Sequence, residues 1–520
     1  MEETVVKAQP YQRRWLALAV LALSLVVIGM DNTILNVALP TLVRDLRATA
    51  SELQWIVDSY VLVFAGLLLT MGALGDRFGR KLALLVGMVI FAIASAGSAW
   101  ASSPELLIAT RAAMGIGAAL IMPSTLSIIT EIFPPNERGR AIAAWAALAG
   151  LGIVAGPVIG GWLLENYWWG SIFLVNLPIV LLALVAGYAL VPESKDPKAT
   201  PLDPIGAALS IGGLSALVFG IIEAPDRGWT DGVTLAAFGL AAVLLAAFVA
   251  WELRSKHPML RISFFKDPRF TAASIAITLI FFALFGAIFV LTQHLQFVLG
   301  YSALEAGFRV TPIATLVIGA PIAARVVERI GTKAVVTAGL AVVAIALWLV
   351  SGVDIDSGYA PIGWALALMG LGMGATMAPA TDSIMGSLPL AKAGVGSAMN
   401  DTTRMVGGAL GVAVIGSVLS SSYGEAMAPA VSNLPAPAAT AASDSVGAAL
   451  AVAGRNGPPA VDLIQAARSA YVESMGDAVI VAAEAALLGA VVALVFLPAR
   501  PREGVTRSDD VVRPLETAAR

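Results

Sequence analysis

The chain has 520 residues, of which 58% are hydrophobic and only 13% are Asp, Glu, Lys or Arg, about half the usual charged share of a soluble protein. About 300 apolar residues suffice for roughly fifteen bilayer-spanning helices, which together with a mean hydropathy of +0.85 excludes a soluble protein. A net charge of -3 argues against a nucleic-acid binder, and the absence of Cys excludes disulfides, thiolate metal sites and Cys nucleophiles.

Apolar segments separated by short polar or Gly/Pro-rich stretches predict an all-α integral membrane protein with fourteen transmembrane helices. The predicted spans are 15–38, 54–74, 82–101, 105–127, 141–163, 170–192, 204–223, 233–252, 270–293, 306–324, 333–352, 361–384, 396–421 and 475–498. Basic residues precede the first span and no small-residue cleavage site occurs before Asp31, so the span is interpreted as a retained helix.

Basic residues are unevenly distributed between the loops. With fourteen spans, 24 Lys and Arg residues fall on the side of the two termini, 6 fall on the opposite side, and Arg111 and Arg404 lie inside helices. The positive-inside rule therefore predicts that both termini are cytoplasmic. Because a miscount by one helix would scramble this asymmetry, the split also supports the count of fourteen.

A short loop pattern recurs at an offset of 252 residues. The sequence from Asp76 to Lys81 matches that from Glu328 to Lys333 at its acid, Arg, apolar, Gly and Lys positions. This repeat predicts two duplicated six-helix bundles with two inserted helices between them, an organisation typical of transporters whose site lies between the halves. The predicted parts are a cytoplasmic N-terminus (1–14), an N-terminal bundle (15–192), a linker with the inserted helices (193–268), a C-terminal bundle (269–500) containing an extracytoplasmic loop (425–473), and a cytoplasmic tail (501–520).

Every charge inside a span is a candidate functional residue, because placing a charge at the bilayer centre costs about 2.5–3.5 kcal/mol. The intramembrane ionisable residues are Asp31, Asp58, Arg111, Asp401, Arg404 and Glu484. Asp31 lies well inside the first span, with polar neighbours that lipid-facing packing would not need. It is predicted to act in proton coupling and substrate binding; a structural ion pair with Arg111 is the alternative, and such a pair could itself serve coupling.

Asp58 lies close to Trp55 and Tyr60, and an acid beside aromatic faces can bind lipophilic cations through charge and cation–π attraction. An interfacial acid among belt aromatics is the competing interpretation, since Asp58 is only about four residues into its span. Asp401 and Arg404 are three residues apart on one helix face, which predicts a local ion pair or a proton or substrate role for Asp401. No partner is predicted for Glu484.

Two glycine-containing motifs are predicted to act in conformational gating, together with Arg404. Gly152, Gly156 and Gly160, with Pro157, form a smooth helix face that allows close approach or a kink, although such stripes often serve packing alone. The loop from Gly72 to Lys81 combines one acid with three cations and could latch helix ends through charge and dipole interactions. Its candidate residues are Gly72, Asp76, Arg77, Gly79 and Arg80, and a plain positive-inside anchor is the alternative.

Several chemistries lack their usual sequence elements. There is no GxxxxGK[ST] phosphate loop, and His257 and His294, the two histidines, are far apart and predicted to lie on opposite sides of the membrane. We therefore expect neither a metal site nor a cofactor, and no enzyme activity; the energy source would be a proton gradient.

These motifs together resemble the 14-helix drug/proton antiporters of the major facilitator superfamily, which are related to quaternary-ammonium multidrug exporters. The resemblance extends over about residues 15–500. It rests on the loop Gly72–Lys81, on Arg111-Ala-Ala-Met-Gly115 in the fourth span, on the Gly152–Gly161 antiporter-type motif, and on Asp31–Pro40, which is similar to a first-helix motif of the 14-helix branch.

The resemblance implies two six-helix bundles with alternating access and a proton-coupled efflux cycle in which Arg111 is a coupling element near Asp31. It also implies that Asp31 and Asp58 match acids that matter for cationic drugs, and that Asp401 sits where such exporters often have an acid. The span 306–324 lacks the acid of relatives that handle dications, and Trp168–Phe173 lacks an Arg often found there.

The sequence thus predicts a multi-pass cell-membrane antiporter that exports lipophilic, most simply cationic, compounds and exchanges them for protons, within membrane lipid and as a monomer. A lipid flippase or an exporter of an endogenous metabolite on the same fold is the alternative. An uptake symporter or a non-transporting sensor is a third hypothesis, and a membrane enzyme a distant fourth.

Overall fold

The computed structural model describes residues 12–195, 202–387, 393–454 and 460–498, and within them it contains helices and no β-strand. The first half comprises α1 (Arg14–Asp45), α2 (Ala50–Phe78), α3 (Arg80–Ala99), α4 (Pro104–Ile132), α5 (Pro135–Asn166), α6 (Ser171–Leu174) and α7 (Asn176–Leu190). Next come α8 (Pro204–Arg227), α9 (Gly232–Arg254) and the short η1 (Ile262–Lys266).

The second half comprises α10 (Pro268–Gln293) with its π-helical extension η2 (His294–Val298), α11 (Ala303–Val310), η3 (Thr311–Thr315), α12 (Leu316–Ile330), α13 (Thr332–Ser351), α14 (Tyr359–Gly386), α15 (Ala393–Val431), α16 (Ala436–Asp444), α17 (Val446–Ala453) and α18 (Ala460–Phe496). The predicted tail 501–520 and most of the predicted N-terminus 1–14 lie outside the described residues.

Among the described residues, thirteen helices or continuous helical segments are long and apolar enough to cross a membrane. They include thirteen of the predicted spans, and the remaining one, 141–163, lies in the 32-residue helix α5. Three of these segments combine more than one element: α6 with α7, α10 with η2, and α11 with η3 and α12. The predicted all-α integral membrane fold is confirmed, while the count of fourteen and the cytoplasmic termini stay predictions.

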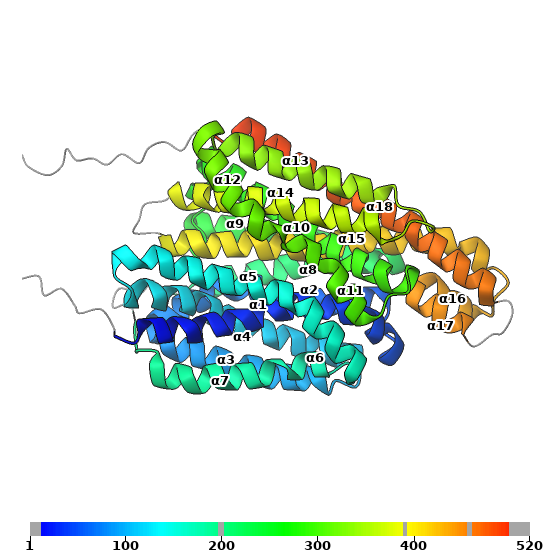
Figure 1. The fold of residues 1–520 in the computed structure, drawn as a ribbon, viewed down its shortest axis with the longest axis horizontal. Coiled ribbons are helices and arrows are strands. Elements are labelled where there is room, and N and C mark those ends of the chain that lie inside the picture. Colours follow the sequence, from blue (N-terminus) through cyan, green and yellow to red (C-terminus); the bar gives the residue numbers. More distant parts are fainter. Residues whose placement is uncertain (1–11, 196–201, 388–392, 455–459, 499–520) are drawn as a thin grey trace, which may run out of the picture.

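The two halves repeat the same packing pattern. In the first half α1 packs on α5 and α4 packs on α2 and α3; in the second α10 packs on α15 and α14 packs on α12 and α13. Figure 1 shows the first half below the second, with the start of α1 and the end of α18 at the same end of the bundle. This end is called the predicted cytoplasmic end, and the opposite one the predicted outer end.

The two loops of the sequence repeat have matching backbones. Gly79 (φ 127°) separates α2 from α3, and Gly331 (φ 87°) separates α12 from α13. Each glycine ends one helix and begins the next in a conformation that an L residue with a side chain rarely adopts. The repeated glycine is therefore needed for the tight turn itself.

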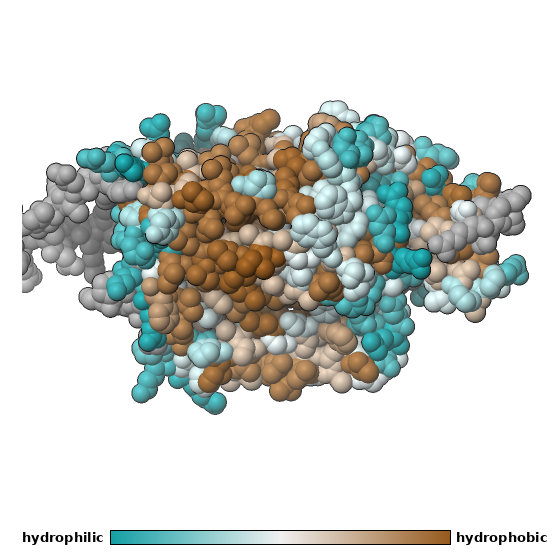
Figure 2. Space-filling view, turned by 90° about the horizontal axis from the view of Figure 1, so that it is seen from below, coloured by the Kyte–Doolittle hydropathy of each residue, from teal (hydrophilic) through white to brown (hydrophobic). Residues whose placement is uncertain are grey.

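The helices between the halves lie on the outside of the bundle. Helix α8 packs against α2 and α15, so it covers the seam where the two halves meet, and α9 packs mainly on α8. On the face shown in Figure 2, a broad apolar belt lies between two hydrophilic zones. The belt includes exposed apolar residues such as Val86, Ile93, Leu182 and Val185, as expected for a lipid-facing surface.

The segment 425–473 was predicted as an extracytoplasmic loop, but its described residues are largely helical. Helix α15 continues to Val431, α18 already begins at Ala460, and α16 and α17 fold back between them. The segment is rich in Ala, the strongest helix former, and Pro435 directly precedes the start of α16. Helices α16 and α17 project at the predicted outer end (Figure 1), where α17 also touches α1.

Contacts at the predicted outer end join the two halves. The Gln296 side chain donates a hydrogen bond to the Val37 carbonyl of α1 at 2.9 Å. The backbone N–H of Leu304 donates to Glu165 at the end of α5 at 3.3 Å. These bonds hold the halves together at this end.

Candidate functional site

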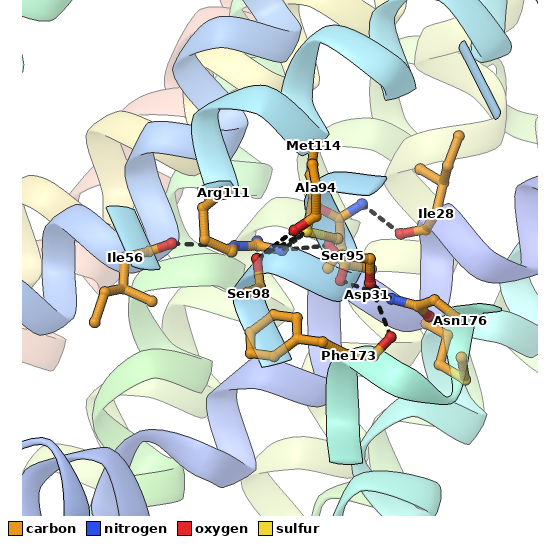
Figure 3. Close-up of polar contacts among 12 residues, drawn as sticks. Ile28, Asp31, Ile56, Ala94, Ser95, Ser98, Arg111, Met114, Phe173 and Asn176 are labelled. Atoms are coloured by element: carbon orange, nitrogen blue, oxygen red, sulfur yellow. Dashed lines mark hydrogen bonds and ion pairs between the residues drawn. The ribbon is translucent and has the colours of Figure 1, made fainter. Parts of the chain in front are cut away.

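A buried ion pair joins the first and fourth helices. The Arg111 Nη1 of α4 lies 2.5 Å from Oδ2 of Asp31 on α1, and the two side chains are only 2% and 0% exposed. Asn176, at the start of α7, donates to the other Asp31 oxygen at 3.3 Å. Figure 3 shows the guanidinium and the amide converging on this carboxylate. The pairing that the sequence left open is therefore present.

The rest of the Arg111 side chain is held by α2. Its Nε donates to the Ile56 carbonyl at 3.2 Å, and its guanidinium lies 4.4 Å from the ring centroid of Tyr60. Because removing one partner of a buried pair leaves an uncompensated charge, the loss typically costs about 3–5 kcal/mol. The pair therefore ties α1, α2 and α4 together.

Two uncharged residues complete this network and were missed in the sequence. Asn176 also donates to the Ser95 hydroxyl at 3.1 Å, and Ser95 donates to the Phe173 carbonyl at 2.8 Å (Figure 3). An Asn inside the otherwise apolar stretch of the sixth span was the available signal, because a buried amide needs hydrogen-bond partners.

Asp58 is a buried carboxylate without a partner. It is 0% exposed on α2, and neither of its oxygens has a hydrogen-bond partner among the described residues. An isolated ionised carboxylate is very costly in an apolar environment, so such a group binds either a proton or another cation. The structure therefore leaves both Asp58 oxygens free for a proton or another cation.

The aromatic residues near Asp58 in sequence face other groups. The Trp55 Nε1 donates to Glu223 of α8 at 3.3 Å, and its ring lies 6.3 Å from that of Phe219. Tyr60 lies under Arg111, and residues two apart on a helix point to different faces. The structure thus places Trp55 against α8 and Tyr60 against Arg111, and the role of both residues in substrate binding stays a prediction.

Asp401 and Arg404 form the local pair that their spacing predicts. Arg404 Nη1 lies 3.6 Å from Asp401 Oδ1 on α15. Arg404 also donates to Thr381 of α14 at 3.2 Å and lies 5.6 Å from the ring centroid of Phe281 on α10. This pair belongs to the second half, whereas Asp31, Asp58 and Arg111 belong to the first. Glu484 is exposed on α18.

The glycine motif seats α5 directly on α1. A methyl group on Gly152, Gly156 or Gly160 would collide with Val26, with Met30 and Thr33, or with Ile34 of α1 respectively. The Thr33 hydroxyl donates across this contact to the Ile153 carbonyl at 3.0 Å. Helix α1 thus packs against the smooth glycine face that the sequence predicts.

The same segment of α5 also touches the second half. The backbone of Pro157 lies against Gly307 of α11, and Gly161 lies against Ala303 and Leu304. Close backbone approach of this kind has little tolerance for added atoms. The motif therefore connects packing inside the first half with contact between the halves.

Replacing Gly156 with Val should separate α5 from α1 and lower the stability of the purified protein by about 1–3 kcal/mol. Gly150→Val is the matched control, because a Cβ at Gly150 meets nothing within 4 Å. The measurement is the unfolding midpoint in detergent. Equal midpoints for the two variants would contradict the close-packing role of Gly156.

The segment Gly72–Lys81, predicted as a loop, forms the end of α2, the turn at Gly79 and the start of α3, and it contacts α4 and α7. Arg80 pairs with Asp76 at 2.7 Å and with Glu131 of α4 at 2.6 Å. Lys81 donates to the Tyr188 carbonyl of α7 at 2.8 Å. Gly72 lies against Pro123 of α4, and Arg77 lies 5.5 Å from the ring centroid of Phe78. Glu131 and the Tyr188 carbonyl were missed because only folding brings them to this loop.

The fold and these buried charges define a multi-pass membrane transporter built from two similar helical halves. Residues 21–412 match the family model of the Major Facilitator Superfamily, and the chain belongs to this superfamily. In the described residues, no group of three or more His, Asp or Glu side chains is placed to hold a metal ion.

Curated relatives match almost the whole chain. The multidrug efflux pump LfrA of Mycolicibacterium smegmatis is 39% identical, covering 92% of this chain and 95% of that protein. The tetracenomycin C resistance and export protein of Streptomyces glaucescens is 33% identical, covering 98% and 96%. The methyl viologen resistance protein SmvA of Salmonella typhimurium is 34% identical, covering 92% and 97%.

Solved structures share the fold at low sequence identity. A bacterial homologue of the human lysosomal transporter Spinster, in an inward-facing and unoccupied conformation, aligns with a TM-score of 0.66 at 18% identity, covering 93% of this chain and 98% of that one. A D-xylose–proton symporter aligns with a TM-score of 0.58 at 14% identity, covering 93% and 98%. These structures support the fold, while the family match, the efflux-pump relative and the apolar helices identify the chain as a multi-pass cell-membrane protein.

Proposed function

We propose that the protein is a proton-coupled antiporter that exports lipophilic cations from the cytoplasm or the inner leaflet. The observation that carries this proposal is the buried carboxylate of Asp58, which has no partner among the described residues. A proton and an organic cation can each neutralise it, but not both at once. Mutually exclusive binding of this kind is the basis of exchange. The named relatives include a multidrug efflux pump and resistance proteins, which supports an export function.

The Asp31–Arg111 pair is proposed as the coupling element for Asp58. Ile56 and Tyr60, which contact Arg111, flank Asp58 on α2. A change in the charge of Asp58 that turns or shifts α2 would therefore alter the contacts of Arg111. Asp401 would take part in proton coupling from the second half, where Arg404 holds it.

Alternating access would use the contacts already described. The outer-end bonds from Gln296 and Leu304 hold the halves together, while the glycine face of α5 and the loop around Arg80 would guide the movement of one half against the other. Each half contributes to the site within one chain, so a monomer in membrane lipid would suffice. The proton gradient would supply the energy, with no cofactor.

The test is efflux of ethidium, a fluorescent lipophilic cation, from energised cells that lack their own exporters. Wild-type cells should lose ethidium, and a protonophore should stop the loss because it removes the proton gradient. Asp31→Asn, shown to reach the membrane at the wild-type level, should fail to export. Retained efflux in Asp31→Asn would remove the coupling role of this acid, and no efflux from well-expressed wild type would favour lipid or metabolite export instead.

A further inference from the structure

The segment between α15 and α18 carries a half-buried acid, Asp444, that none of the sites above includes. Asp444 is the last residue of α16 at the predicted outer end. Its two carboxylate oxygens accept hydrogen bonds from the backbone N–H of Ala50, the first residue of α2, at 3.2 and 3.4 Å. A carboxylate at this helix N-terminus is favoured by the helix dipole. Asp444 therefore connects the outer segment to the helix that holds Asp58.

A small cavity, lined mostly by apolar groups with a few polar side chains among them, lies directly inside this contact. It has a volume of about 30 Å³ and is lined by Ala50, Gln54, Gln293, Tyr423, Asp444 and Tyr471, among others. A cavity needs about 10–15 Å³ and several polar partners to hold one water molecule, so this one has room for about two. The Gln54 Oε1 atom is buried without a partner in the described structure and could accept a hydrogen bond from such a water.

The cavity is aligned with Asp58 by the geometry of α2. Ala50, Gln54 and Asp58 are four residues apart, so they lie on one face of the helix. At 1.5 Å per residue, the rise from Ala50 to Asp58 is about 12 Å. Asp444 caps the outer end of this face, Gln54 lies at its middle, and the unpartnered carboxylate of Asp58 lies at its inner end.

We infer that protons from the outer side reach Asp58 through Asp444 and the water-sized cavity along this face of α2. The inference rests on the proposed proton-coupled function. A proton from outside water forms an O–H bond on the Asp444 carboxylate. Breaking that bond passes the proton through cavity water to the Asp58 carboxylate, so one positive charge moves and no electrons are exchanged. The export cycle would load its proton by this route.

The surroundings of Asp444 suit such a proton-accepting group. Burial raises the pKa of Asp444 to about 6, and the negative charges of Asp226 on α8 and Glu52 on α2 act in the same direction. The phenol of Tyr423 on α15 is close enough to sense its charge, and Tyr471 of α18 lines the same cavity. Asp444 is therefore mostly protonated when the outer solution is below pH 6 and mostly ionised well above it.

The experiment uses the full chain in liposomes loaded with ethidium, with two readouts. One is ethidium export driven by a constant pH difference with the acid side outside, measured at outer pH values from 5.5 to 7.5, so that the driving force does not change. The other is ethidium exchange at equal pH on both sides, which needs no net proton movement. Asp444→Asn removes the titrating group but keeps an acceptor for the Ala50 N–H. Glu425→Gln is the matched control, because Glu425 is exposed on the outer part of α15 and does not line the cavity.

Wild type should export more slowly as the outer pH rises above 6, because less Asp444 is protonated. Asp444→Asn should export about tenfold more slowly, as expected when a proton-transfer group is lost, and should lose this pH dependence. Its exchange should stay within about twofold of wild type, since substrate binding is untouched, and Asp444→Glu should restore export.

Two results would overturn the inference while leaving the proposed function intact. One is a wild-type rate and pH profile in Asp444→Asn; the other is a parallel loss of export and exchange, which would mark a structural role for Asp444. Absence of proton-driven export in wild type itself would instead overturn the proposed function, and the inference with it.

Discussion

Arg111→Ala is expected to abolish export and to lower the free energy of unfolding by about 3–5 kcal/mol. The substitution leaves the Asp31 carboxylate, which is completely buried, with the Asn176 amide as its one remaining hydrogen-bond partner in the described part of the chain. It also frees the Ile56 carbonyl that Arg111 binds. The measurement is the unfolding midpoint of the purified variant in detergent, together with ethidium efflux at matched expression.

Two further variants show whether the effect comes from the buried pair. Arg227→Ala breaks the pair with Glu223, in which Arg227 is 46% exposed, and should cost no more than about 1 kcal/mol. The double variant Asp31→Asn/Arg111→Gln leaves no uncompensated charge and should unfold later than Arg111→Ala. An Arg111→Ala protein as stable as wild type would contradict the structural part of this prediction.

Asp58→Asn should also lose export but, unlike Arg111→Ala, should keep the stability of the wild type. Loss of the carboxylate removes the charge that attracts an organic cation, worth about 2–5 kcal/mol for a buried charge pair, so export at low ethidium concentration should fall at least about tenfold. Stability should be unchanged or higher, because the side chain loses no hydrogen bond in the described structure. Efflux rate and unfolding midpoint are measured on the same preparations.

Glu484→Gln is the control for Asp58→Asn, since it removes another acid from a predicted span but one that is exposed on α18. It should export as wild type does. If Asp58→Asn exports ethidium at the wild-type rate, or if Glu484→Gln fails equally, Asp58 is not the cation-binding group.

The membrane helices were predictable because a bilayer requires long apolar segments, whose ends the polar loops mark. The Asp31–Arg111 pair was anticipated for a similar reason: opposite charges in apolar helices have few other partners. The close face of Gly152, Gly156 and Gly160 was also visible in the sequence. Its partner helix α1 was not, since the helix that fills a small-residue face is set by tertiary packing.

Other features depend on neighbours that no local pattern specifies. The Ile56 carbonyl that binds Arg111 belongs to the backbone and has no sequence signal. Tyr60 and Asp58 are two residues apart, so they point to different faces of α2, and this could have been predicted from their spacing in the sequence. Residues 436–453 form two short helices because they are rich in Ala, which favours helix. The segment is too short and too weakly apolar to be recognised as a membrane span from the sequence. The contact of Asp444 with α2 could not be predicted either, because it forms only where the end of α16 packs against the first turn of α2.

Proton release on substrate binding tests most directly whether Asp58 exchanges a proton for an organic cation. Tetraphenylphosphonium is added to the purified protein in weakly buffered detergent near pH 7, and the change in pH is recorded alongside the amount bound. Wild type should release up to about one proton per cation bound, and Asp58→Asn should bind weakly and release none. Tight binding without proton release, or the same release from Asp58→Asn, would contradict exchange at this carboxylate.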